Sequence, residues 1–172
     1  MPSPVGHALG GAIVGLLMPS GASVPPRSLG FPFFVVVAAA VLPDIDFLWG
    51  RHNMETHSLG AAVLAGLAAL TWSRGRDFRL AWSVTLAWST HVLFDWLGSD
   101  DTPPLGVMAL WPVVSDFYFA NASVFEAISR RYWLPNFISH NLLAVTREIA
   151  ILGPLAAAAF WHRRRADAGR RR

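Results

Sequence analysis

The most informative pair of residues for chemistry is His91 and Asp95, which stand four positions apart in "STHVLFDWLG". On a helix this spacing places both side chains on one face, about one turn apart. Neutral imidazole and carboxylate are the nitrogen and oxygen ligands that zinc, iron and manganese take in proteins. A hydrogen-bonded pair on a helix surface is the ordinary explanation for such a spacing. In a helix surrounded by lipid, however, ionisable groups are rare and usually functional.

A second group of polar residues fills "LPDIDFLWGRHNMETHS", between two apolar stretches. Asp44 and Asp46 follow Pro43 at the end of the first of these, where a turn of the chain could aim both carboxylates at one site. One would be a metal ligand, and the other a ligand, an orienting partner for a histidine or a general base. His57 opens the next stretch, and we expect Thr56 to cap its helix. Exposed acids in a turn and a solvated histidine are the alternative interpretations.

Three further histidines and one arginine are weaker candidates. His7 lies at the start of the first apolar stretch, where a lone histidine is ordinarily a packed, hydrogen-bonded residue, and His52 lies in a loop. His140 and Arg147 lie near the start of the last apolar stretch, where Arg147 could bind an anionic headgroup or extend toward the membrane surface. The candidate catalytic residues are Asp46 and His52. The candidate metal ligands are His7, Asp44, Asp46, His57, His91 and Asp95.

Five apolar stretches must position these residues, at about 4–19, 29–49, 58–73, 80–98 and 141–161. Hydrophobic residues make up 53% of the 172-residue chain and charged residues 15%, against about 25% charged in soluble domains. A spanning helix needs about 20 apolar residues, and the first and third stretches would need tilt or local thinning of the bilayer. We therefore predict an all-α, polytopic membrane helix bundle of about five apolar helices, in one domain, 1–172. The aromatic and proline-containing segment 99–140 would form an interfacial cap of short helices; a soluble α-helical bundle is the alternative.

The arginines predict how such a bundle lies in its membrane. All fourteen basic residues are arginine, and six of them stand in the tail 162–172. If the helices cross the membrane in turn, this tail, Arg27 and the arginines of segment 74–79 share one side, which the positive-inside rule makes cytoplasmic. The same alternation places every candidate ligand, and His52, at the non-cytoplasmic side. We expect the tail to contact anionic lipid, not nucleic acid.

The number of candidate ligands exceeds the four of a closed structural zinc site. It suits one catalytic metal with an acid–base carboxylate, or two bridged metals that activate water. Zinc is the expected ion, with manganese and iron as alternatives. The absence of cysteine excludes thiolate ligands, disulfides and cysteine nucleophiles. Neither a G-x-S-x-G elbow nor a glycine-rich phosphate loop occurs in the sequence.

The order of these motifs resembles the YdjM-type family of predicted bacterial inner-membrane, metal-dependent hydrolases, whose namesake member is LexA-regulated. The resemblance rests on "SPVGHALGG", "LPDID", "RHNMETHSL", "HVLFD" and "GVMALWP", which cover most of residues 4–112. The family pattern His-Arg-Gly-x-Thr-His-Ser is matched at His52 and at residues 56–58, whereas Asn53 and Met54 replace the Arg and Gly. The resemblance implies a multi-helix membrane protein with metal-dependent hydrolytic activity. A more distant similarity to all-α zinc-dependent phospholipase C implies a phosphoester, including a lipid one, as substrate.

Residues and resemblance together predict a membrane-bound, metal-dependent hydrolase of the bacterial inner membrane. It would act on a phosphoester or lipid-like substrate through metal-activated water at the non-cytoplasmic face. The aromatic-rich segment 103–137 would admit the substrate, and membrane lipid is the expected partner. A membrane divalent-cation transporter or binding protein that uses the same cluster is the alternative. A structural membrane protein whose site only stabilises the fold is a third interpretation.

Overall fold

The computed structural model describes residues 1–18, 29–50, 52–100 and 103–169. These form five α-helices and one 3₁₀-helix, and the described part of the chain contains no strand. The α-helices are α1 (Pro4–Leu17), α2 (Phe31–Val41), α3 (Leu59–Trp72), α4 (Phe78–Trp96) and α5 (Phe137–Gly169), and the 3₁₀-helix η1 (Leu42–Trp49) continues α2. The all-α class predicted from the sequence is confirmed.

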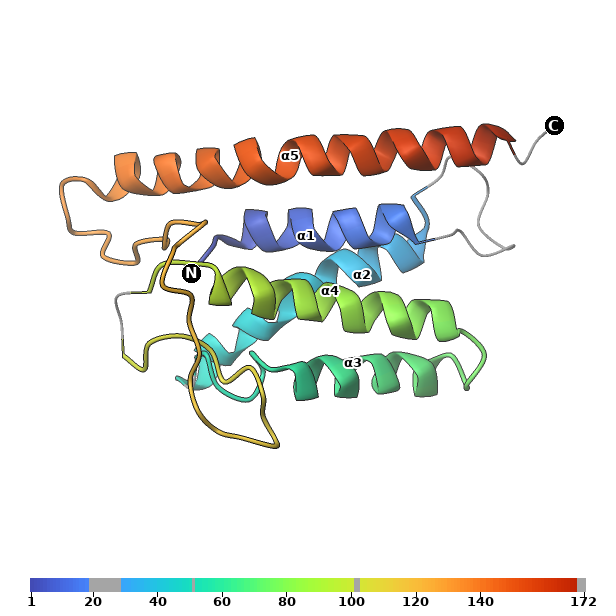
Figure 1. Cartoon of the computed structure of the whole chain (residues 1–172), viewed down its shortest axis with the longest axis horizontal. Helices are drawn as coiled ribbons and strands as arrows, with labels where there is room; N and C mark the ends of the chain where they lie inside the picture. Colours follow the sequence, from blue (N-terminus) through green and yellow to red (C-terminus); the bar gives the residue numbers. More distant parts are fainter. Residues whose placement is uncertain (19–28, 51, 101–102, 170–172) are drawn as a thin grey trace.

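The helices gather several chain segments at one end of the molecule (Figure 1). α1, α3, α4 and α5 run side by side, and α2 crosses behind α1 and α4, contacting both. The start of α1, the 3₁₀-helix η1, the start of α3 and the end of α4 lie at the same end, together with the segment that joins α4 to α5. The predicted ligands belong to these segments, so the fold itself brings them to one end.

Local sequence signals fix where two of these helices begin. Ser3 caps α1, because its side chain accepts hydrogen bonds from the backbone N–H groups of the two residues that follow Pro4. Ser58 caps α3 in the same way. Thr56, which the sequence predicts as that cap, instead donates its hydroxyl proton to Asp46. The predicted cap is therefore two residues too early, and Thr56 belongs to the polar cluster.

Small residues let α1 lie directly against α2 and α4. A Cβ added at Gly11 would lie 2.7 Å from the Ala40 Cβ, and one at Gly10 would lie 2.6 Å from the Phe94 ring. In lipid, where apolar side chains gain little by leaving their solvent, such close backbone approach is a main source of helix association. A larger residue at either position would push α1, and with it His7, away from the other helices.

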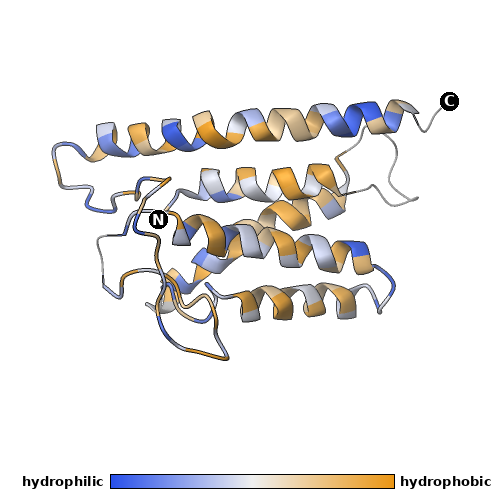
Figure 2. Cartoon of the chain, viewed as in Figure 1, coloured by the Kyte–Doolittle hydropathy of each residue, from blue (hydrophilic) through white to orange (hydrophobic). Residues whose placement is uncertain are grey.

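Figure 2 shows hydrophobic residues along all the helices, and several large apolar side chains, such as Phe31, Leu64 and Trp82, are exposed. Within the described residues, two helices are long and apolar enough to cross a membrane, Phe31–Leu48 (α2 with most of η1) and α5. The prediction of about five such helices is wrong. α1 and α3 have only 14 residues each, and α4, with 19, carries several serines and threonines besides His91 and Asp95.

The segment between α4 and α5 is not the predicted cap of short helices. Its described residues form loops and turns, with two isolated β-bridges that pair Gly98 with Phe125 and Val107 with Tyr118. Four prolines between residues 97 and 136 each remove a backbone donor, which disfavours regular helix. Phe125 and Val107 are 2% and 0% exposed. They anchor the segment on the end of the bundle.

The basic tail predicted at 162–172 is helical as far as it is described. α5 continues to Gly169, and Arg163 donates to the backbone carbonyl of Gly15 on α1. Residues 170–172 lie outside the described part of the chain, as does Arg27, on which the prediction of orientation also rests. The assignment of this end to the cytoplasm stays a prediction.

Candidate metal centre

The structure brings the six predicted ligands together from separate elements. Asp44 is the most exposed of them, with 19% of its side chain accessible, whereas Asp46 is at 1% and the others are at 0%. The cluster is therefore closed except at its Asp44 edge. His7 comes from α1, Asp44 and Asp46 from η1, His57 from the residue before the α3 cap, and His91 and Asp95 from α4.

Asp95 lies at the centre of the cluster. Its Oδ2 is 3.0 Å from His91 Nε2 and 3.4 Å from His57 Nε2. Its Oδ1 is 3.3 Å from His7 Nε2. Asp44 Oδ1 closes the group, at 3.6 Å from His57 Nε2 and 3.7 Å from His91 Nε2. Asp44 Oδ1 and Asp95 Oδ2 thus each lie within 3.7 Å of the Nε2 atoms of both His57 and His91.

These separations fit a tetrahedral metal ion. Ligand atoms at about 2.1 Å from such an ion lie about 3.4 Å from one another, and the observed pairs range from 3.0 to 3.7 Å. Within the described residues, Nε2 of His57, Nε2 of His91 and both oxygens of Asp95 are buried without a hydrogen-bond partner. Buried polar atoms are rarely left unpaired, because their desolvation is costly. A cation bound between these residues would satisfy Nε2 of both histidines and Oδ2 of Asp95, while Oδ1 of Asp95 faces His7.

Two histidines are oriented by partners on the far side of their rings. His91 Nδ1 donates to the Ala40 carbonyl at 2.8 Å, and His57 Nδ1 lies 3.1 Å from Asp46 Oδ2. With the proton on Nδ1, each ring keeps the lone pair of Nε2 for the side that faces Asp95. Outer partners of this kind set the tautomer and the orientation of metal-binding histidines and raise their basicity.

Asp46 is engaged on both oxygens by groups that are not part of the ligand tetrahedron. His52 Nδ1 lies 2.8 Å from its Oδ1, and Thr56 donates to its Oδ2 at 2.7 Å. Because η1 has about three residues per turn, Asp44 and Asp46 leave it in different directions and meet opposite nitrogens of His57. Of the roles that the sequence leaves open for Asp46, this geometry favours the orienting partner of His57.

The electrostatics of the cluster are visible at His57, in the connection before α3. Burial by itself would lower the pKa of this imidazole. Interactions with the nearby carboxylates of Asp44, Asp46 and Asp95 outweigh burial and raise the pKa of His57 to about 9. In the absence of another cation His57 therefore carries a proton at neutral pH. The carboxylates of the cluster create a site that attracts positive charge, whether a proton or a metal ion.

His7 faces the second oxygen of Asp95. Its ring stacks on that of His91, with centroids 3.7 Å apart, and neither of its nitrogens has a hydrogen-bond partner within the described residues. His7, Asp44 and His91 also offer ligand atoms within 4.8 Å of one another. Both the one-metal and the two-metal arrangements predicted from the sequence therefore have ligand atoms, with Asp95 able to bridge.

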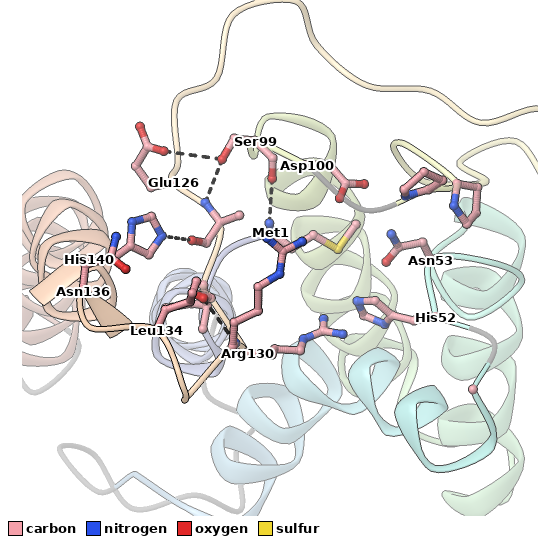
Figure 3. Close-up of a pocket in the computed structure, with 17 residues that line it drawn as sticks. Met1, His52, Asn53, Ser99, Asp100, Glu126, Arg130, Leu134, Asn136 and His140 are labelled. Atoms are coloured by element: carbon pink, nitrogen blue, oxygen red, sulfur yellow. Dashed lines mark hydrogen bonds between the residues drawn. The ribbon is translucent and has the colours of Figure 1, made fainter. Parts of the chain in front are cut away.

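His52 stands between the cluster and a pocket of about 600 Å³, whose wall it forms together with the segment before α5 (Figure 3). Its Nδ1 is bonded to Asp46, and its Nε2 is buried without a partner in the described part of the chain. Asp44, His52 and His57 also lie close enough to share an ion. His52 thus connects the pocket to the ligand cluster.

Two weaker candidates lie outside the cluster. His140 lines the pocket and bonds the Ala127 carbonyl through Nε2, at 2.8 Å. Arg147 donates to Glu126 at 2.8 Å, in an ion pair whose two side chains are 42% and 41% exposed. Both residues fasten the segment before α5 to that helix, and their polar groups are engaged by the protein.

Three contributors to the site were not recognised in the sequence. The Ala40 carbonyl orients His91, and a backbone group leaves no trace in the residue types. The Thr56 hydroxyl bonds Asp46, although its position next to a helix start favours a cap. No motif in the sequence singles out Arg130, yet its guanidinium carbon lies 3.7 Å from the centre of the Phe47 ring, on which His52 also stacks.

Comparison with known proteins gives one match. A family model described as YdjM inner membrane protein matches residues 1–165, nearly the whole chain. No curated protein and no solved structure matches the sequence.

Proposed function

We propose that this chain, which belongs to the YdjM inner membrane protein family, is a membrane-bound, metal-dependent hydrolase. His57, His91, Asp44 and Asp95 would hold one divalent ion. Zinc is the best match to two imidazoles and two carboxylates in a tetrahedral arrangement, with manganese and iron as alternatives. His7 and the second oxygen of Asp95 offer part of a second site.

The observation that carries this proposal is the convergence of buried ligand atoms that lack partners. Asp95 brings a carboxylate into the interior, and neither oxygen is hydrogen-bonded to a described residue. Stability gives no reason for this arrangement, since apolar residues of similar volume would often stabilise a buried site as well or better. A bound divalent cation would offset the cost, which supports a metal-binding role.

When bound, the ion supplies Lewis-acid chemistry and makes water more acidic at neutral pH. Asp46 and the Ala40 carbonyl hold the Nδ1 protons of His57 and His91, so that both rings present Nε2 to the site. Water and substrate would enter beside Asp44, the exposed edge of the cluster. The hydrogen-bonded pair of Asp46 and His52 is the candidate acid–base group, because it lies between the ligands and the pocket.

We propose that the substrate is a phosphoester or a lipid-like molecule that enters through this pocket. The pocket wall includes apolar residues such as Ile128 and Leu134. Tyr132 and Trp133, in the same segment, are 77% and 67% exposed. Aromatic side chains of this kind prefer the membrane–water interface. The arginine distribution supports a non-cytoplasmic position for this end and a cytoplasmic C-terminus.

Metal analysis of the purified full-length protein tests the proposal. We expect at least one equivalent of zinc in the wild type, none in the double variant His91→Ala/Asp95→Ala, and wild-type content in the control His140→Ala. Hydrolysis of phosphomonoester and phospholipid substrates should disappear with a chelator and return with zinc. A wild-type protein without metal, or a double variant with unchanged metal content, would contradict the proposal.

A divalent-cation transporter or binding protein is the second candidate, because the complete burial of His57, His91 and Asp95 would also suit a carried ion. Transporter sites commonly lie near the middle of the membrane and between repeats, whereas this cluster lies at one end of the bundle. Metal uptake into proteoliposomes that is lost in Asp46→Asn, without any hydrolysis, would favour transport.

A further inference from the structure

We propose that Arg130 is an anion-binding residue that holds the phosphate group of the substrate beside the metal centre. This inference rests on the proposed function and deepens it, since it assigns a residue to the recognition of a phosphate-bearing molecule. Arg130 lies in the segment between α4 and α5, forms part of the pocket wall and lies near His52 in Figure 3. Its position follows from three independent observations.

The first observation is a stack of planar groups. The Arg130 guanidinium carbon lies 3.7 Å from the centre of the Phe47 ring. The His52 ring stacks on the same phenyl group, with centroids 3.8 Å apart and 25° between the planes. Two groups this close to one ring must use opposite faces. Phe47 therefore supports one face of the guanidinium, whose N–H donors lie around its edge, where a bidentate anion binds an arginine.

The second observation is that Arg130 and the open edge of the metal centre share one side of η1. Phe47 follows Asp44 by three residues, and in a 3₁₀-helix side chains at this spacing lie above one another. Burial lowers the pKa of the Arg130 guanidinium, and the Asp44 carboxylate is the strongest of the influences that oppose this shift. Phe47, which contacts the guanidinium, thus lies on the same side of η1 as Asp44, the most exposed of the proposed ligands.

The third observation concerns the balance of charge in the pocket. Two acidic side chains line it, but Glu126 pairs with Arg147, and Asp100 accepts a hydrogen bond from the backbone of Gly106. Arg130 makes no ion pair with any described residue. A positioned cation that lacks an ionic partner among the described residues, beside a metal-ligand cluster, matches an anionic group of the substrate. Phosphate is the natural choice, because its oxygens suit the planar fork of arginine.

Binding of inorganic phosphate to the full-length protein in detergent, freed of metal by a chelator, tests the inference by equilibrium dialysis. We expect measurable binding by the wild type and about a 10- to 100-fold weaker affinity in Arg130→Gln, the range for a charged hydrogen-bonded contact. Arg131→Gln is the matched control, because Arg131 is the neighbouring pocket arginine, and its affinity should stay within about threefold of wild type.

Three further variants separate phosphate recognition from folding. Arg130→Lys keeps the charge but loses the planar fork, so its phosphate affinity should fall between those of wild type and Arg130→Gln. Phe47→Leu removes the ring that positions the guanidinium and should weaken binding, while Phe47→Tyr should restore it. Equal phosphate affinity in wild type and Arg130→Gln, or equal losses in Arg130→Gln and Arg131→Gln, would overturn the inference.

A second ligand identifies the source of the phosphate. Dihexanoyl phosphatidic acid should bind more tightly than inorganic phosphate if the substrate is a lipid, and with similar affinity if it is a soluble phosphate compound. Both ligands are measured without metal, so the two proposals fail separately. If the wild-type protein binds metal but no phosphate, the proposed role of Arg130 is overturned. If it binds phosphate but no metal, the proposal of a metal-dependent hydrolase is overturned.

Discussion

Two buried carboxylates, Asp95 on α4 and Glu148 on α5, have opposite surroundings in the same molecule. Glu148 is fully buried, and its two oxygens accept hydrogen bonds from the backbone N–H and the hydroxyl of Ser3, the first at 2.6 Å. Asp95 is 1% exposed, and its oxygens have no hydrogen-bond partner within the described residues. Its close neighbours are instead the Nε2 atoms of three histidines.

The difference separates a carboxylate that holds the fold from one that is available to an ion. Both oxygens of Glu148 have hydrogen-bond partners, and these hydrogen bonds join α5 to the start of α1. The amide dipoles at the start of a helix favour a negative charge at this position. The oxygen lone pairs of Asp95 face the same small space as the nitrogen lone pairs of the histidines. Burying these groups together costs free energy unless a cation binds between them. Burial alone does not indicate a binding site. Buried polar atoms that converge and lack hydrogen-bond partners do.

The substitution Asp95→Asn should give the largest effect, because it removes the central negative charge and keeps the shape. We expect metal affinity to fall by more than about 100-fold, beyond the loss seen for outer partners of a ligand. Metal analysis and thermal unfolding with and without zinc measure this effect, and zinc should raise the unfolding temperature of the wild type only. An Asp95→Asn variant with full metal content would show that Asp95 is structural, like Glu148.

The substitution Glu148→Ala should affect stability and leave the metal centre intact. It leaves the buried donors of Ser3 without a partner, so we expect the free energy of unfolding to fall by about 3 kcal/mol. Denaturant unfolding in detergent measures the loss, and metal analysis of the folded fraction should give the wild-type ratio. Glu148→Gln, which keeps one acceptor, should lose less. A folded Glu148→Ala protein without metal would contradict the comparison.

The substitution Asp46→Asn should give an intermediate effect, which is restricted to the affinity for the metal ion. Asp46 orients His57 from the side away from the ligands, and loss of such a partner typically weakens metal binding by about 10- to 100-fold. Competition with a chelator of known affinity measures the change. The number of ions per protein should stay the same; a lower number would indicate that Asp46 is itself a ligand.

The substitution His140→Ala should have the smallest effect of the four. Its hydrogen bond to the Ala127 carbonyl fastens a loop, and we expect a loss of about 1 kcal/mol in the free energy of unfolding. Metal affinity should not change. A clear loss of metal in this variant, measured by the same chelator competition, would extend the centre to residues that the distances leave outside.

The parts of the site that could be predicted from the sequence depend on the spacing of residues within one helix and on the alternating direction of successive helices. The four-residue spacing of His91 and Asp95 is visible in any helix, and helices that alternate in direction bring His7 and His57 to the same end. The roles of Asp44 and Asp46 could not be separated, because they depend on the tighter turn of η1 and on Thr56. These contacts form only when the chain has folded.

The fold was predicted in class but not in detail, for a related reason. Composition indicates apolar helices, yet hydrophobicity alone does not tell a helix long enough to cross a bilayer from the 14-residue helices α1 and α3. The segment between α4 and α5 contains short apolar runs that read as helices. Its described residues form loops and turns instead, and isolated bridges such as that of Val107 with Tyr118 supply some of its backbone hydrogen bonds. The partnership of Ser3 with Glu148 spans 145 positions, beyond the reach of any local pattern.

The same partnership has a consequence for the biogenesis of the protein. Synthesis proceeds from the N-terminus, so the ribosome makes Ser3 and His7 first and reaches Glu148 only after four of the five α-helices. Gly6 leaves the space that the Glu148 carboxylate later fills, since a Cβ there would lie 2.8 Å from its Oε2. The start of the first helix is therefore hydrogen-bonded to a residue of the last helix. All six proposed metal ligands are synthesised before Glu148, so the ligand set is present before the contact that fastens α1 to α5 can form.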